Sequence, residues 1–182
     1  MKLASVAVTV LALFTIGGDA SQAQAPSGVP SPRPSESPCA TPQHRQFDFW
    51  VGDWNVRDPQ GAQAGTNLIT REFDGCVIQE HWVGARGMRG GSFNIYSAAT
   101  KTWHQSWVDS NGTLLLLEGE FKDGKMQLAG EGPTPQGARR MHKISWEPRK
   151  DGTVRQFWQL SDDGGKTWNV AFDGIYERKP GK

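Results

Sequence analysis

Two carboxylates near the middle of the chain, Glu80 and Asp109, are the residues whose type and position could support catalysis. Each lies two residues from a tryptophan in an expected β-strand, Glu80 from Trp82 and Asp109 from Trp107, so each pair is predicted to share one face. A carboxyl group in an aromatic cavity has a shifted pKa, which suits a general base in isomerase or hydrolase chemistry. The alternative is that both are solvated or hydrogen-bonded structural groups. No nucleophile elbow or Gly-rich phosphate loop accompanies them, so no catalytic residue is assigned.

The same alternation predicts a cavity with aromatic and polar walls. A tryptophan in the middle of a strand is expected in the core, but its buried indole N–H needs a hydrogen-bond partner, so inward tryptophans imply inward polar groups. The residues predicted to line a ligand cavity are Glu80, Trp82, Asn94, Tyr96, Gln105, Trp107, Gln156 and Trp158. The alternative is that these polar groups satisfy only one another and buried water. A single β-bulge would reverse every inward assignment that follows it.

The histidines of the chain are His44, His81, His104 and His142. None has the spacing of a His-x-His or His-Glu-x-x-His ligand pair, so neither a metal site nor a cofactor is predicted. Strand alternation places His81 and His104 opposite to the neighbouring tryptophans, and therefore on the outside of the sheet. The orientation of His142 is left open by this argument.

The first 43 residues are predicted to lie outside the folded domain. Residues 1–23 combine Lys2, an apolar run and small residues, which is the pattern of a signal peptide. The apolar run has about 14 residues, fewer than the roughly 20 that a membrane span requires, so no membrane insertion is expected. Residues 24–43 are rich in Pro, Ser, Ala and Gln and are predicted to be a disordered tether. We expect an exported protein, periplasmic or secreted.

The two cysteines, Cys39 and Cys76, are predicted to form a disulfide, because the chain is directed to an oxidising compartment. A metal-binding pair is the alternative. The disulfide would join the end of the tether to the folded domain.

Residues 44–182 are predicted to form one all-β domain. Apolar residues recur at period two and are interrupted by Gly, Asp, Asn or Pro, which indicates about ten antiparallel strands in a meander. The strands are expected at 49–56, 65–73, 76–83, 92–96, 102–108, 113–121, 125–130, 139–146, 153–160 and 167–178, after a short turn at 44–49. Asn-Gly and Asp-Gly pairs between them predict tight hairpins. We expect a closed barrel, because an open meander would leave two edges free to aggregate, with a two-sheet sandwich as the alternative.

The first expected strand contains Gly52-Asp53-Trp54, which resembles the Gly-x-Trp signature of lipocalins. In that family the tryptophan closes the barrel floor and an arginine near the last strand packs across it, so the resemblance gives these roles to Trp54 and Arg178. The lipocalin Thr-Asp-Tyr motif is absent, and ten strands fit fatty-acid-binding proteins or the haem-binding nitrobindins better. The nitrobindin resemblance implies an axial histidine that reaches into the barrel, so a haem is not expected unless His142 turns inward. The opening at 47–54 and the Trp-His-Gln-Ser-Trp-Val-Asp segment also resemble a family of exported bacterial proteins of unknown function. These resemblances imply a calycin-like barrel, but they do not indicate an activity.

A second motif, Ser161 to Trp168, is similar to the Asp-box of sialidases, Ser-x-Asp-x-Gly-x-x-Trp. The Asp-box caps a hairpin, so the resemblance implies that Asp163 bonds the turn backbone and that Trp168 packs beneath it. Because a sialidase propeller needs several copies and this chain has one clear copy, glycosidase activity is not inferred.

The net charge of +1, with acidic and basic residues interleaved, favours neither nucleic acid nor an anionic membrane as a partner. The leading hypothesis is a module that binds a small, partly apolar or amphipathic molecule. An enzyme using an interior carboxylate is the second, and a structural or interaction module with a filled core is the third. The run Leu114 to Leu117 suggests either burial on both faces or contact with another chain, so a homodimer is also considered.

Overall fold

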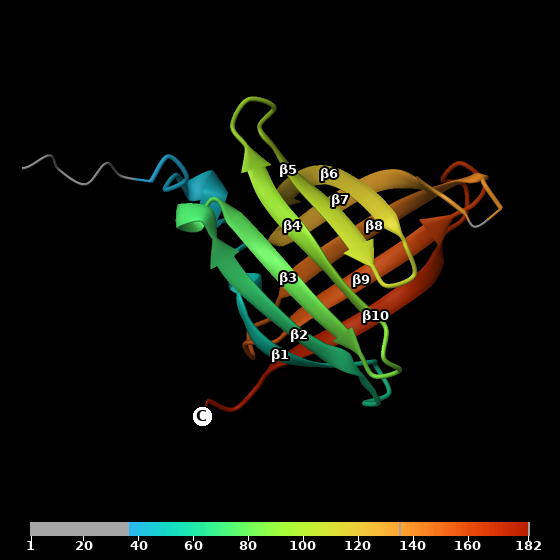
Figure 1. Cartoon of the computed structure of the whole chain (residues 1–182), viewed down its shortest axis with the longest axis horizontal. Coiled ribbons are helices and arrows are strands. Elements are labelled where there is room, and N and C mark those ends of the chain that lie inside the picture. The colour runs from blue at the N-terminus through green and yellow to red at the C-terminus, as the bar shows by residue number, and fades with distance from the viewer. Residues whose placement is uncertain (1–36, 135, 182) are drawn as a thin grey trace, which may run out of the picture. The chain divides into compact units, whose positions relative to one another are not determined.

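Ten antiparallel strands, paired in chain order, close into a barrel in which β1 also pairs with β10 (Figure 1). The computed structural model describes residues 37–134 and 136–181, so the predicted signal peptide and residues 24–36 of the predicted tether lie outside the described residues. The strands are β1 (Gly52–Arg57), β2 (Gln63–Glu72), β3 (Val77–Gly84), β4 (Arg89–Ser97), β5 (Thr102–Asp109), β6 (Leu114–Lys122), β7 (Lys125–Pro133), β8 (Arg139–Pro148), β9 (Val154–Ser161) and β10 (Asn169–Arg178). The predicted closed meander is confirmed, and the sandwich alternative is wrong because β1 and β10 pair and leave no open edge.

Local turn chemistry sets the hairpins, as the connection between β6 and β7 shows. Asp123 and Gly124 have φ angles of 53° and 75°, and the residues on either side, Lys122 and Lys125, are paired across the hairpin. Positive φ at both central residues is typical of the tight turn that matches the twist of the two strands. The Asp-Gly pair therefore fixes the register of this hairpin.

The four leucines at the start of β6 alternate between the two faces of the sheet. Leu115 and Leu117 lie in the core, whereas Leu114 and Leu116 are 56% and 47% exposed. The expectation of burial on both faces is therefore wrong for this chain, because the strand alternation places every second leucine on the outside. The other alternative, contact with another chain through this face, stays a prediction.

The N-terminal turns plug one end of the barrel. The first strand was expected from residue 49, but Phe49 and Trp50 belong to the 3-10 turn η2 (Asp48–Trp50), which follows η1 (Pro42–Arg45). In a 3-10 turn residues i and i+3 lie on the same side, so Phe47 and Trp50 point together into the barrel. Their rings stack at 4.9 Å, and Phe47 also meets Trp103 edge-on at 5.7 Å. Both side chains are fully buried, so this end of the barrel is filled.

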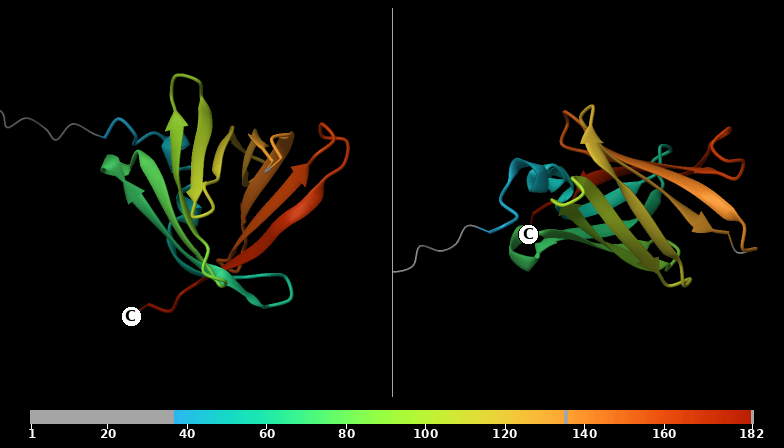
Figure 2. Two further views of the ribbon diagram at one scale, coloured as in Figure 1. Left: turned by 45° about the vertical axis from the view of Figure 1, so that its right-hand side comes forward. Right: turned by 90° about the horizontal axis from the view of Figure 1, so that it is seen from above.

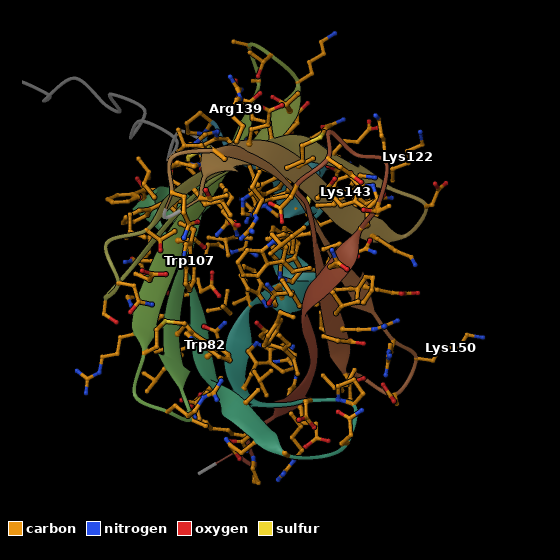
Figure 3. All side chains as sticks on the ribbon, turned by 90° about the vertical axis from the view of Figure 1, so that its right-hand side faces the viewer. Trp82, Trp107, Lys122, Arg139, Lys143 and Lys150 are labelled. Carbon is orange, nitrogen blue, oxygen red and sulfur yellow. A yellow bond between two sulfur atoms is a disulfide. The ribbon has the colours of Figure 1, made fainter. Side chains whose placement is uncertain are left out.

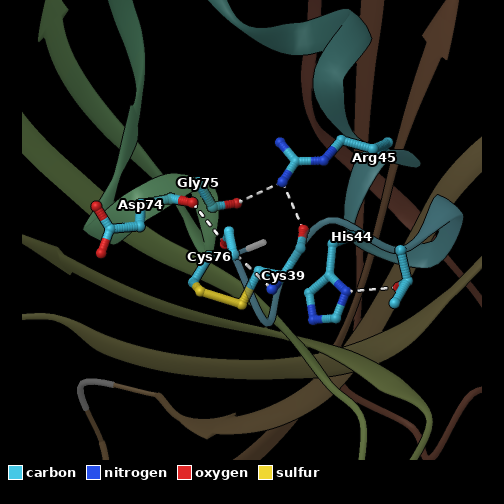
Figure 4. The surroundings of a disulfide bond; sticks show 8 residues. Cys39, His44, Arg45, Asp74, Gly75 and Cys76 are labelled. Atoms are coloured by element: carbon cyan, nitrogen blue, oxygen red, sulfur yellow. Dashed lines mark hydrogen bonds between the residues drawn. A yellow bond between two sulfur atoms is a disulfide. The ribbon is translucent and has the colours of Figure 1, made fainter. Parts of the chain in front are cut away.

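The plug is fastened beside η3 (Phe73–Gly75), the turn that connects β2 to β3 (Figures 1 and 2). The predicted disulfide between Cys39 and Cys76 is confirmed, and the metal-pair alternative is wrong (Figure 4). The Arg45 guanidinium donates hydrogen bonds to the carbonyl oxygens of Cys39 and Gly75, the second at 3.3 Å. Residues 37–43, the end of the predicted tether, are thereby held against the barrel. Within the described ranges no helix has the length and apolar character that a bilayer crossing requires.

Candidate functional site

Trp54 and Arg178 close the floor of the barrel behind the plug. The Trp54 indole is fully buried and donates a hydrogen bond to the Trp50 carbonyl oxygen at 2.8 Å. The Arg178 guanidinium carbon lies 4.4 Å from the centre of the Trp54 ring, and the same side chain donates to the Val51 carbonyl oxygen at 3.3 Å. A Cβ atom at Gly52 would lie 2.5 Å from Arg178 Nη1 and 3.2 Å from the Trp54 ring, so a side chain at this position would displace the guanidinium. The contact has the geometry that the lipocalin resemblance implied.

A cavity of about 110 Å³ opens to solvent at the other end of the barrel. It is lined by Glu80, Trp82, Met88, Gln105, Trp107, Leu115, Ile144, Trp146, Gln156, Trp158, Phe172 and Tyr176. Trp107 and Leu115 lie at the end of β5 and the start of β6, whereas Trp103, which contacts the plug, lies at the start of β5. The plug and the cavity therefore occupy opposite ends of one interior.

Six of the eight residues named in the sequence analysis line the cavity, namely Glu80, Trp82, Gln105, Trp107, Gln156 and Trp158. Asn94 and Tyr96 do not line it. Asn94 is fully buried among polar neighbours, and Tyr96 packs at the plugged end, 5.1 Å from the His44 ring and 6.0 Å from the Trp103 ring. Both share the inward parity of β4, but Tyr96 lies at the strand end nearest the plug and so faces a filled part of the interior.

Two glycines let the aromatic wall form. A Cβ atom on Gly90 would lie 2.4 Å from the Trp107 ring, and one on Gly65 would lie 2.7 Å from the Trp82 ring. The two indoles therefore lie directly against the backbone of neighbouring strands, on the wall that includes β3 and β5 (Figure 3). Because a glycine in a strand often marks such a close approach, these positions are a sequence signal for where the indoles lie.

Glu80 is the buried carboxylate of the cavity. Its side chain is 5% exposed and accepts hydrogen bonds from Asn67 Nδ2 and from Ser92 Oγ, each at 2.7 Å. Burial raises its pKa from 4.5 to about 7, although the hydrogen bonds from Ser92 and Asn67 favour the ionised form. Glu80 is therefore a group that exchanges a proton near neutral pH.

A chain of hydrogen bonds extends from Glu80 towards β10 and β9. Asn67 Nδ2 also donates to the Tyr176 hydroxyl at 3.2 Å, and this hydroxyl in turn donates to Gln156 Oε1. Burial raises the pKa of the Tyr176 hydroxyl well above its ordinary value, and the nearby charge of Glu80 raises it further. Tyr176 therefore stays protonated and serves as a donor.

A second chain of hydrogen bonds extends from Ser92 along β4 and β5. Asn94 Nδ2 donates to Ser92 Oγ at 2.9 Å and to the Ile78 carbonyl oxygen at 3.0 Å. Gln105 Nε2 donates to Asn94 Oδ1 at 2.8 Å. Asn94 thus holds Ser92 and the lining residue Gln105 in place.

Asp109 lies at the rim and is bound to the β5–β6 turn. It accepts hydrogen bonds from the backbone N–H groups of Asn111 and Thr113, at 2.9 and 3.1 Å, and from Trp107 Nε1 at 3.4 Å. Partial burial alone would raise its pKa, but these hydrogen bonds outweigh burial and hold the pKa below its ordinary value. Asp109 does not line the cavity and shares no hydrogen bond with Glu80, so the two carboxylates do not form an acid/base pair.

His142 faces the interior, whereas His81 is exposed and His104 lies on the outside beside Glu118. The His142 ring stacks on Trp158 at 5.6 Å and accepts a hydrogen bond from Trp158 Nε1 at 3.2 Å. Burial, and then the nearby charge of Arg140, lower its pKa.

An inward histidine was the condition under which the nitrobindin resemblance would allow a haem. A cavity of about 110 Å³ is smaller than the ~150 Å³ cavity that holds one benzene, so it does not enclose a haem, and His142 is not among its lining residues. Among the described residues no group of three or more His, Cys, Asp or Glu side chains could hold a metal ion.

The Asp-box-like segment caps the β9–β10 hairpin, away from the cavity. Asp163 accepts hydrogen bonds from the Thr167 side chain, from the Ser161 hydroxyl and from two backbone N–H groups, which together lower its pKa to about 2. Trp168 donates to the Gly165 carbonyl oxygen at 3.0 Å and lies under the Lys143 ammonium at 3.8 Å. Neither Asp163 nor Trp168 lines the cavity.

Six lining residues were not predicted: Met88, Leu115, Ile144, Trp146, Phe172 and Tyr176. Ile144 and Trp146 share the inward face of β8, so strand alternation alone could have found them. Phe172 is harder to place because the pairing of β10 with β9 shifts between Val170 and Phe172. Trp146 is almost fully buried, and its indole N–H has no hydrogen-bond partner among the described residues.

No protein-family model matches this chain, and no curated protein matches it either.

Proposed function

We propose that this protein is an exported binding protein that takes a small, partly apolar molecule into the open end of its barrel. The observation that supports the proposal most is the cavity itself, which is closed behind by the plug and walled by aromatic side chains. A concave, mainly apolar pocket with a few placed polar groups is the usual form of a small-molecule site. In this cavity Glu80, Gln105, Gln156 and Tyr176 supply the polar groups.

The cavity volume sets the size of the ligand group. At about 110 Å³ it is larger than a filled core would leave, and it is comparable with the ~150 Å³ cavity that holds a benzene molecule. The buried N–H of Trp146 would gain a hydrogen bond from an acceptor atom on a ligand or a water. We therefore expect the enclosed group to be no larger than a benzene ring, about six heavy atoms, with any remainder of the ligand projecting from the mouth.

The direct test is native mass spectrometry of the mature domain purified from its own compartment, before and after denaturation. A noncovalent adduct that is lost on denaturation would support the proposal and give the ligand mass. A mass equal to that of the bare chain, with no change on exposure to a panel of small amphipathic molecules, would count against it.

A matched pair of variants locates the site. Leu115 lines the cavity and Leu116 is its exposed neighbour, so Leu115→Phe fills the cavity while Leu116→Phe adds the same atoms outside. We expect Leu115→Phe to weaken ligand binding at least ten-fold and Leu116→Phe to leave it unchanged, measured by tryptophan fluorescence titration. Equal affinities in the two variants would place the ligand elsewhere.

The second candidate function is proton transfer by Glu80, favoured by its buried position in the cavity lining, which raises its pKa to about 7. A general acid or base is most effective when its pKa lies near the working pH. For any ligand identified by mass, Glu80→Gln should keep the affinity and abolish turnover if Glu80 is catalytic. A Glu80→Gln variant that still converts the ligand at the wild-type rate would remove this candidate.

A further inference from the structure

Among the residues that line the cavity, the ionisable side chains are the Tyr176 phenol and the carboxyl group of Glu80. The lining has no Lys, Arg or His, so no charged group in the wall opposes a positive charge. Glu80 sits in this lining with two hydrogen bonds to its oxygens, from Asn67 and Ser92. Because an ionised carboxylate has about four acceptor positions, Glu80 retains capacity for a further partner.

The remaining wall is rich in π surface. Six of the lining side chains are aromatic: Trp82, Trp107, Trp146, Trp158, Phe172 and Tyr176. They come from five strands, and Phe172 meets Trp82 edge-on at 5.9 Å, so aromatic groups surround the cavity on several sides. The faces of aromatic rings are electronegative and attract cations, and a cage of such rings is the usual site for a quaternary ammonium group.

We propose that the group that enters the cavity is a small organic cation, a quaternary or protonated amine, held by the aromatic faces and by the Glu80 carboxylate. This inference rests on the proposed binding function and names its ligand class. A buried charge needs an opposite charge or metal to offset its desolvation. The lining contains no basic side chain that could pair with ionised Glu80. A bound cation would supply the opposite charge.

The charges at the rim are consistent with this ligand. Asp109 lies beside Trp107, and hydrogen bonds keep it ionised. The positive charge of Arg140, which lies near His142, is paired with Asp162 through two hydrogen bonds at 2.6 and 3.0 Å. Asp109 therefore places a negative group beside the lining residue Trp107, and the positive charge near His142 is paired.

The binding should be linked to the proton on Glu80. Of the other titratable groups that face the interior near it, Tyr176 on β10 stays protonated, and the lowered pKa of His142 on β8 keeps this ring neutral at neutral pH. β2, β4 and β5 face Glu80 with Asn67, Ser92, Asn94 and Gln105, which do not titrate. A permanent cation should thus bind about ten-fold more weakly at pH 6 than at pH 8, because Glu80 must first lose its proton.

The probe pair for the test is choline and 3,3-dimethyl-1-butanol, which differ only in whether nitrogen or carbon carries the three methyl groups. Calorimetric titration of the full mature chain at pH 8 should give choline at least a ten-fold higher affinity than its neutral analogue. Glu80→Gln should weaken choline binding at least ten-fold, leave the alcohol unchanged and remove the pH dependence. The outer-face Glu118→Gln variant removes the same charge elsewhere and should change neither affinity.

Three results would overturn the inference, and they separate it from the proposed function. Equal or better binding of the neutral alcohol would show an apolar site without cation preference, which leaves the binding function standing. Choline binding that Glu80→Gln does not change, in a variant shown by circular dichroism to be folded, would remove the role of Glu80. If neither probe binds and the purified protein also carries no noncovalent adduct, both the inference and the proposed function fail.

Discussion

The Ser92 hydroxyl donates a hydrogen bond to the Glu80 carboxylate at 2.7 Å, between neighbouring strands in the interior of the barrel. Together with the hydrogen bond from Asn67 it favours the ionised form of the carboxylate, yet the pKa is still raised to about 7. Burial is therefore the stronger effect at this position. The protein keeps a group in its core that is costly to ionise.

The first prediction follows from this pKa. Between pH 4.5 and about 7 the folded state holds a proton on Glu80 that the unfolded chain releases, so the free energy of unfolding falls as the pH rises. Below this range both states are protonated and the penalty is absent. The shift corresponds to about 3 kcal/mol of lost stability by pH 8, measurable by urea unfolding from pH 4.5 to 8.

Glu80→Gln provides the control for this prediction, because glutamine keeps the shape of the side chain and removes its charge. The variant should be about as stable as the wild type at pH 4.5 and more stable at pH 8. A wild-type stability that rises by more than 1 kcal/mol over this range, relative to the variant, would show that Glu80 is ionised more easily in the fold than in the unfolded chain.

The second prediction concerns the close approach of Trp107 to the backbone. In Gly90→Ala the added Cβ atom would lie 2.4 Å from the Trp107 ring and 2.9 Å from the Val108 carbonyl oxygen. The ring must move, which should cost about 1–3 kcal/mol of stability and narrow the cavity. The near-ultraviolet circular dichroism of the tryptophans should change, whereas Gly181→Ala, where no atom lies within 4 Å, should change neither quantity.

The third prediction concerns Arg178, whose guanidinium covers the Trp54 ring. Arg178→Ala removes a cation–π contact and a hydrogen bond to the Val51 carbonyl oxygen, and should lower the free energy of unfolding by about 1 kcal/mol. Arg139→Ala removes an exposed ion pair with Glu131 and should cost less than about 0.5 kcal/mol. If the two variants lose equal free energy of unfolding in urea, the contact of Arg178 with Trp54 stabilises the protein no more than an exposed ion pair does.

The strand order could be predicted because the signals for it are local. Alternation identified the ten strands, and turn pairs such as Asp123-Gly124 favour the positive φ angles of a tight hairpin. The six predicted residues that line the cavity come from the same parity argument, since Glu80 and Trp82 share one face of β3 and both face inward. Local pattern is therefore sufficient to assign the faces of strands that have no bulge.

The remainder of the site depends on how far along the barrel each residue lies, and a periodic pattern does not contain that information. Tyr96 faces inward as expected, yet the plug fills its part of the interior. The plug itself follows from the spacing of Phe47 and Trp50, which the sequence analysis assigned partly to a strand. In the same way Asp109 has the parity of Trp107 but lies at the rim, where the turn backbone binds it.

The last prediction concerns the disulfide that fastens the plug. Cys39 and Cys76 are 37 residues apart, and a loop of that length restricts the unfolded chain by about 4 kcal/mol in the chain-entropy description. The double variant Cys39→Ser, Cys76→Ser should lose about this much stability, and wild type unfolded in the presence of reductant should match it. Since Arg45 still bonds the Gly75 carbonyl oxygen, the folded variant should keep Phe47 and Trp50 buried, and their near-ultraviolet signal should persist without denaturant. A variant that loses this signal while still folded would show that the disulfide holds the plug in the native state, and does more than restrict the unfolded chain.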